Sequence, residues 1–166
     1  MTMLFDKGYM AAALVTVGAA GILAVVYTAQ YGFGLAPCSL CYVQRVPYFA
    51  VLIMGALSLM PAIDAATRRV VLFHLAGLFV LNAGFGVYHA GVEFHWWQGP
   101  IACTGSGVAS LDDIAAALTK PGPPACDQPA FLFLGISMAG YNVIAALMLA
   151  AASLAAALRT AWWPKP

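Results

Sequence analysis

Apolar residues along this chain gather into four long stretches, and polar residues are concentrated in the segments between and outside them. A helix that crosses the roughly 30 Å hydrocarbon core of a membrane needs about 20 mostly apolar residues. The pattern therefore predicts four transmembrane helices, over about residues 9–31, 46–63, 70–92 and 129–158. The last stretch is longer than a span requires, which indicates tilt or an interfacial end.

Four spans place two connecting segments, about 32–45 and 93–128, on one side of the membrane and both termini on the other. The longer segment contains a short apolar stripe at helical spacing over about 108–118, which predicts a short interfacial helix. The sequence has no internal repeat. We expect an all-α integral membrane protein: one membrane domain over residues 1–166, a four-transmembrane-helix bundle with a long external loop.

Composition supports a membrane protein. Of 166 residues, 7 are Lys or Arg and 6 are Asp or Glu, so 8% carry a charge, against roughly 25% in soluble domains. Hydrophobic residues make up 63%, and so few charges would leave a soluble protein with large exposed apolar patches. The net charge of +1, without a basic cluster, gives no means of neutralising phosphates. We therefore expect the lipid bilayer as an environment and no nucleic acid as a partner.

Basic residues predict the orientation, because loops on the cytoplasmic side carry an excess of Lys and Arg. The side that holds the termini has five of them, and the opposite side has Lys120 and the membrane-edge Arg45. Four of the six acidic residues lie in the long external segment. Both termini are thus predicted to be cytoplasmic in a multi-pass protein. The five basic residues are Lys7, Arg68, Arg69, Arg159 and Lys165.

All four cysteines fall in the two external segments, as Cys38, Cys41, Cys103 and Cys126. Packing alone would not sort them in this way, because free cysteine is common in apolar cores. An oxidising external compartment favours disulfides. Four cysteines allow three pairings, so the sequence predicts two disulfides and leaves their connectivity open.

The run Cys38-Ser39-Leu40-Cys41 is a C-x-x-C motif. A disulfide across so small a loop adds little entropic stabilisation, whereas redox exchange is its more usual role. Pro37 precedes the motif and the second span follows, so we expect it near a helix N-terminus, whose dipole favours a thiolate. Arg45, four residues after Cys41, would add a cation on the same helix face. An interfacial anchor is the alternative role for this arginine.

Two other interpretations of the cysteines stay open. They could be structural bridges in a non-catalytic membrane subunit, in which case Arg45 would be dispensable. They could also bind zinc, but Cys103 and Cys126 are 23 residues apart and are not spaced as a second ligand pair. We expect redox chemistry and no metal.

Three motifs together resemble the bacterial disulfide bond formation protein B (DsbB) family, over nearly the whole chain. They are Pro37–Arg45, which reads PCSLCYVQR, then Tyr88–Glu93, which reads YHAGVE, and Gly99–Cys103, which reads GPIAC. The resemblance implies a membrane oxidoreductase of the bacterial inner membrane that generates disulfides. Such a protein re-oxidises a periplasmic DsbA-like thioredoxin-fold protein and passes the electrons through two cysteine pairs to a quinone, ubiquinone or menaquinone.

The resemblance also implies residue roles. Cys103 would form the mixed disulfide with the partner, and Cys126 would exchange with Cys38. Cys41 would contact the quinone as a thiolate, which Arg45 would stabilise.

His89 lies near the external end of the third span, and an ionisable group within a span is a functional candidate. We expect it to act on a quinone carbonyl or a proton, with a structural hydrogen bond to a neighbouring helix as the alternative. A rival family, the vitamin K epoxide reductase-like proteins, also couples a quinone to two cysteine pairs. There the loop pair precedes the C-x-x-C motif, and here the order is reversed.

Overall fold

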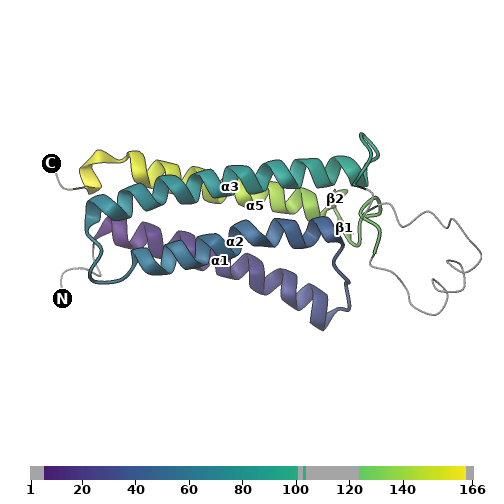
Figure 1. Ribbon diagram of the computed structural model, residues 1–166, viewed down its shortest axis with the longest axis horizontal. Helices are drawn as coiled ribbons and strands as arrows, with labels where there is room; N and C mark the ends of the chain where they lie inside the picture. The colour runs from purple at the N-terminus through teal and green to yellow at the C-terminus, as the bar shows by residue number, and fades with distance from the viewer. Residues whose placement is uncertain (1–5, 101–102, 104–123, 164–166) are drawn as a thin grey trace, which may run out of the picture.

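Each of the four predicted spans overlaps a helix that is long and apolar enough to cross a membrane. The computed structural model describes residues 6–100, 103 and 124–163, and the helices run side by side along its long axis (Figure 1). The helices are α1 (Lys7–Gly32), α2 (Ser39–Ser58), α3 (Ala65–Glu93) and α5 (Met138–Leu158).

The helices form a four-membered bundle in which α1 and α3 each pack against both α2 and α5. The α3–α5 interface is the most extensive, and Gly86 lies within it. A Cβ atom at Gly86 would be 2.7 Å from Val143 Cγ2, so the absence of a side chain lets the two helices approach closely. The start of α1 and the end of α5 lie at one end of the bundle, and a short hairpin lies at the other (Figure 1).

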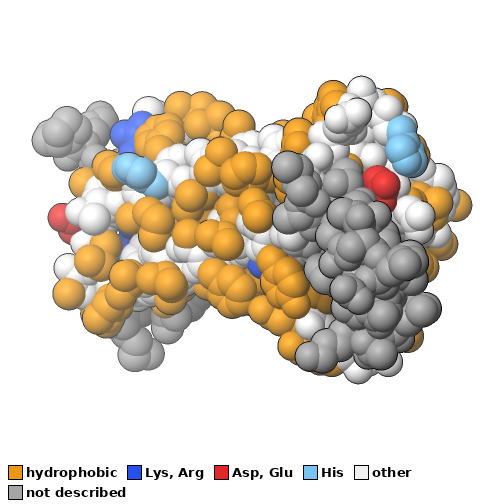
Figure 2. All heavy atoms as spheres, turned by 45° about the vertical axis from the view of Figure 1, so that its right-hand side comes forward, with side chains coloured by type: hydrophobic (Ala, Val, Ile, Leu, Met, Phe, Trp, Pro, Cys, Tyr) orange, Lys and Arg blue, Asp and Glu red, His pale blue; other side chains and the backbone are white. Residues whose placement is uncertain are grey.

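The bundle is apolar both inside and outside. Ala12, Val15, Ala19 and Leu23 recur every three or four residues and place one face of α1 in the core. Many large apolar side chains on the outward faces are nevertheless exposed, for example Leu14 of α1, and they cover much of the face in Figure 2. A surface of this kind is suited to lipid rather than to water.

Every one of these four helices begins with a side-chain cap. Asp6, Asp64 and Ser137 cap α1, α3 and α5 by accepting from backbone N–H groups, as these residue types commonly do. At the start of α2 the cap is a sulfur atom, because Cys38 Sγ accepts from the backbone N–H of Cys41. Helix α2 therefore begins at the C-x-x-C motif, as the sequence predicts.

Helix α2 begins seven residues earlier than the predicted 46–63 span. The apolar stretch had to start after Gln44 and Arg45, yet both side chains are buried within the bundle. Polar residues that face the interior of a membrane bundle do not end a helix, although they end an apolar run.

Helix α5 begins at Met138 rather than near 129. The preceding apolar residues form a hairpin of β1 (Leu132–Phe133) and β2 (Ile136–Ser137). Its two turn residues, Leu134 and Gly135, both have positive φ, at 49° and 77°, as a two-residue type I′ turn requires. The extra length of the fourth apolar stretch is thus a hairpin. The interfacial helix predicted over 108–118 lies outside the described residues.

Candidate redox site

The two cysteine pairs meet at the end of the bundle opposite the termini. Cys103 and Cys126 form a disulfide, whereas Cys38 and Cys41 are free, with their Sγ atoms 2.8 Å apart. Cys38, Cys103 and Cys126 are buried and form one cluster with Val92, at the end of α3. The described state thus has an oxidised loop pair in contact with a reduced C-x-x-C pair.

The position of Cys38 favours a thiolate. Its Sγ caps α2 and lies 3.3 Å from the backbone nitrogen of Cys41. The hydrogen bond from the Cys41 thiol lowers the pKa of Cys38 to about 4, with His89 contributing in the same direction and burial opposing it. A thiolate rather than a thiol is the nucleophile and the better leaving group in disulfide exchange.

Ser39 connects the two cysteine pairs. Its Oγ lies 2.9 Å from Cys103 Sγ and 3.4 Å from Cys126 Sγ. Disulfide sulfurs carry no proton, so the hydroxyl group is the donor. The loop pair is also closed by a backbone hydrogen bond of 2.9 Å from Cys126 N to Cys103 O. A residue within the C-x-x-C motif therefore holds the loop disulfide against the start of α2.

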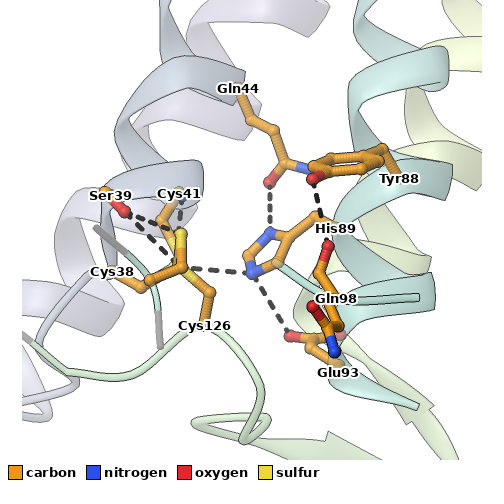
Figure 3. The surroundings of a disulfide bond; sticks show 10 residues. Cys38, Ser39, Cys41, Gln44, Tyr88, His89, Glu93, Gln98 and Cys126 are labelled. Atoms are coloured by element: carbon orange, nitrogen blue, oxygen red, sulfur yellow. Dashed lines mark hydrogen bonds and ion pairs between the residues drawn. A yellow bond between two sulfur atoms is a disulfide. The ribbon is translucent and has the colours of Figure 1, made fainter. Parts of the chain in front are cut away.

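His89 lies directly beside Cys38. Its Nε2 is 3.4 Å from Cys38 Sγ and 3.7 Å from Glu93 Oε1, and its Nδ1 is 3.3 Å from Gln44 Oε1. Figure 3 shows the imidazole between the Gln44 amide on one side and the sulfur and carboxylate on the other. All four side chains are buried. The histidine thus faces the reactive sulfur across the α2–α3 interface.

Arg45 is buried and does not extend to the surface. Its Nη1 donates to Gln30 Oε1 at 2.7 Å, and its guanidinium lies 4.9 Å from the centre of the Tyr27 ring and 5.0 Å from that of Tyr42. Among the described residues, no carboxylate lies within 4 Å of it. Arg45 is therefore a buried cation contacted by neutral groups.

Cys41 and Arg45 line the same cavity, of about 70 Å³, together with Tyr48. A larger, mostly apolar cavity of about 1100 Å³ lies between α1 and α5. Ala29, Leu35 and Asn142 are among the residues that line both. The inner cavity thus adjoins a wide apolar groove, which has the form of a site for a small polar head with a long apolar tail.

The structure brings the six predicted site residues to one end of the bundle, where they lie in two adjacent groups. Cys38, Cys103, Cys126 and His89 form one group, and Cys41 and Arg45 line the cavity on the other side of the motif. His89 does not line either cavity. The Sγ atoms of Cys38 and Cys41 and a ring nitrogen of His89 lie within 4.8 Å of one another.

Sequence reasoning missed three residues of the site: Ser39, Gln44 and Glu93. The spacing of two of them could have revealed them, because residues three or four apart are neighbours on a helix. Gln44 follows Cys41 by three residues, and Glu93 follows His89 by four. Once α2 is taken to begin at Ser39, this spacing places Gln44 on the same side of the helix as the motif. Ser39 carries no such signal, because its partners are distant in sequence.

The chain is similar in sequence to known proteins of one family. Residues 9–156 match the family model described as "Disulfide bond formation protein DsbB". The chain is 27% identical over 156 residues to a disulfide bond formation protein B of Polaromonas sp. strain JS666, covering 90% of each chain. It is 30% identical over 154 residues to one of Ralstonia nicotianae, covering 88% of this chain and 91% of that protein. No solved structure matched the chain.

Proposed function

Because the chain belongs to the DsbB family, whose members are disulfide-forming membrane proteins, we propose that it oxidises a periplasmic thioredoxin-fold partner of the DsbA type and passes the electrons to a membrane quinone. One observation carries the proposal. The C-x-x-C pair lies between a loop disulfide, which it contacts through Ser39, and a cavity that holds a buried cation. The pair is thus placed to take electrons on one side and release them on the other.

On the loop side, the chemistry is thiol–disulfide exchange. A thiolate of the partner attacks Cys103, which forms a mixed disulfide and leaves Cys126 as a thiolate. The partner's second thiolate then attacks the partner sulfur of that mixed disulfide. A disulfide forms within the partner, and Cys103 leaves as a thiolate. Cys126 attacks Cys38 of the oxidised C-x-x-C pair, and Cys41 leaves as a thiolate. Cys103 finally attacks Cys126, which re-forms the loop disulfide and releases Cys38.

The residues around Cys41 fit a quinone. Arg45 supplies a buried donor that is free of carboxylates among the described residues, and the adjoining groove between α1 and α5 is suited to an isoprenoid tail. Ubiquinone or menaquinone, when bound there, supplies an acceptor for two electrons. Cys41 would hold the negative charge next to that acceptor, and Arg45 would stabilise it and orient an acceptor oxygen.

We place the protein in the bacterial inner membrane, with both termini in the cytoplasm and the cysteines facing the periplasm. The supporting observations are the excess of basic residues in the segments on the side of the termini, and the position of the start of α1 and the end of α5 at the same end of the bundle (Figure 1). An oxidising compartment at the opposite end suits a disulfide-generating site.

The experiment is a turnover assay with purified protein, a reduced DsbA-type partner, and ubiquinone or menaquinone in parallel. We expect one quinone reduced for each partner disulfide formed, and no turnover in Cys41→Ser. A Cys41→Ser protein that turns over normally would contradict the proposal. Cysteines that stay oxidised whatever the quinone supply would instead support a non-catalytic subunit with structural disulfides.

A further inference from the structure

A chain of buried polar side chains, His89, Gln44 and Glu93, leads away from Cys38, and Gln44 also lines the cavity that Cys41 and Arg45 share. His89 Nε2 lies 3.4 Å from Cys38 Sγ, and His89 Nδ1 lies 3.3 Å from Gln44 Oε1. His89 is 2% exposed and Gln44 8%. Figure 3 shows that Gln44 and Cys38 approach opposite edges of the ring. The imidazole is therefore held at both nitrogens, and one of them contacts a reacting atom.

Gln44 determines which nitrogen of His89 carries the proton. A carboxamide oxygen can only accept, so the hydrogen bond to Gln44 Oε1 requires a proton on Nδ1. In the neutral ring the lone pair is then on Nε2, the nitrogen that faces Cys38. The geometry presents a proton acceptor to the Cys38 thiol.

Glu93 completes the arrangement. Its Oε1 lies 3.7 Å from His89 Nε2, one helical turn away on α3, and its Oε2 has no hydrogen-bond partner among the described residues. A carboxylate at that distance stabilises an imidazolium. The other titratable groups that face the ring are Cys38 and Cys41 of α2; from the β2–α5 junction, the Ser137 hydroxyl faces Glu93.

We propose that His89 is the proton acceptor for Cys38, with Gln44 and Glu93 as positioning residues that fix its tautomer and support its charged form. The inference rests on the proposed function and assigns His89 to the sulfur rather than to the quinone. When Cys103 attacks Cys126, the Cys103–Cys126 bond forms, the Cys126–Cys38 bond breaks, and the electron pair stays on Cys38. His89, protonated on Nε2, stabilises that thiolate. In the reverse step His89 takes the thiol proton of Cys38, and the Cys38 sulfur attacks Cys126. The Cys38–Cys126 bond forms, the Cys103–Cys126 bond breaks, and the electron pair leaves on Cys103.

The test is a titration of the reduced C-x-x-C pair, followed by the ultraviolet absorbance of the thiolate, with neither quinone nor partner present. The low-pH transition is assigned to Cys38 by its loss in Cys38→Ser. The hydrogen bond from Cys41 holds the pKa of Cys38 well below its usual range, so the wild-type thiolate should persist below neutral pH. His89→Ala should move the transition to higher pH, because the thiolate loses a partner that stabilises it.

Positioning is tested by a pair of variants at Gln44. Gln44→Leu removes the acceptor for Nδ1 and should move the Cys38 transition upward, whereas Gln44→Glu keeps an acceptor oxygen and should restore it. Glu93→Gln should give an intermediate shift. His74→Ala is the matched control, since His74 is exposed and hydrogen-bonds only the Val70 carbonyl of its own helix. It should leave the titration unchanged.

The outcomes separate this inference from the proposed function. A Cys38 transition that does not move in His89→Ala, in protein that still passes electrons to quinone, would overturn the inference alone. A transition that moves in His89→Ala and Gln44→Leu, in protein that does not oxidise a DsbA-type partner, would overturn the proposed function and retain the proton role.

Discussion

Two arginines are buried to nearly the same extent at opposite ends of this bundle, and they differ in what surrounds them. Arg68 is 5% exposed and Arg45 is 7% exposed. Arg68 donates to the carbonyls of Ser58 and Ile63, both at 3.0 Å, and pairs with Asp6 at 3.6 Å. Its donors are thus used within the protein, and its charge is compensated. Its contacts tie α3 to the end of α2 and to the start of α1.

Arg45 has the same burial without the same compensation. Its protein acceptor is Gln30, and its other contacts are the faces of Tyr27 and Tyr42. A buried cation of this kind costs free energy unless something else pairs with it. Under the proposed function, a quinone in the cavity that Arg45 shares with Cys41 would be that partner. The two arginines have nearly equal burial and different acceptors, so the set of acceptors rather than burial makes Arg45 the candidate for a functional role.

The largest expected effect is on quinone reduction. Arg45→Met should lower the rate of quinone reduction roughly 10- to 100-fold, because a charge-assisted hydrogen bond contributes about 1.5–3 kcal/mol. The measurement is quinone consumption at limiting quinone concentration. Arg68→Met is the matched control and should retain the wild-type rate per folded molecule. Unchanged quinone kinetics in Arg45→Met would reduce Arg45 to an anchor.

The free energy of unfolding should fall more in Arg68→Met than in Arg45→Met, the opposite of the order expected for quinone reduction. Arg68→Met leaves the Ser58 and Ile63 carbonyls without their donor, so the free energy of unfolding should fall by about 2 kcal/mol. Arg45→Met should lower it less, because it removes an uncompensated charge along with the hydrogen bond to Gln30. Thermal unfolding in the same detergent measures both variants. Equal losses of stability in the two variants would contradict the claim that Arg68 is compensated within the protein and Arg45 is not.

A third variant makes Arg45 resemble Arg68. Gln30→Glu places a carboxylate where Arg45 now has an amide acceptor, and it should compensate the guanidinium charge. We expect quinone reduction to fall by roughly 3- to 10-fold, for a loss of about 1 kcal/mol, with no loss of stability. Gln30→Met, which removes the acceptor and adds no charge, is the control. Faster quinone reduction in Gln30→Glu would show that the cation is not the feature that matters.

The smallest effect is expected at the ion pair of Arg68. Asp6→Asn keeps a side-chain oxygen for the cap on Gly8 N and removes the charge, so it isolates the pairing at 3.6 Å. Because Asp6 is partly exposed, the loss of stability should be about 0.5 kcal/mol and should shrink at high salt. Thermal unfolding at two salt concentrations tests it. A loss above about 2 kcal/mol would mean that Asp6, rather than the two carbonyls, compensates Arg68.

Much of the fold follows from the hydrophobic pattern, because a membrane span is a long and simple signal. The helix starts follow less well. Gln44 and Arg45 interrupt the apolar run and are nonetheless inside α2, and the apolar residues before Met138 form a hairpin whose turn depends on the backbone at Leu134 and Gly135. Hydropathy does not distinguish a buried polar residue from a loop residue.

The residues of the candidate site could be proposed from the sequence, but their contacts could not. The cysteines, Arg45 and His89 stand out by residue type and spacing. That His89 faces Cys38, and that Ser39 contacts the loop disulfide, depends on how α2, α3 and the loop pack together. These contacts join residues up to 87 positions apart, and no local pattern in one sequence carries that information.

The most direct test of the central claim is a count of quinones reduced by the protein alone. Fully reduced protein in lipid nanodiscs is mixed with excess quinone without oxygen or partner. Wild-type protein should reduce two quinones per chain, because two dithiols each supply two electrons. Protein with Cys103 and Cys126 replaced by Ala should reduce one, and protein with Cys38 and Cys41 replaced by Ala should reduce none. Quinone reduction by this last variant would contradict the claim that electrons leave through the C-x-x-C pair.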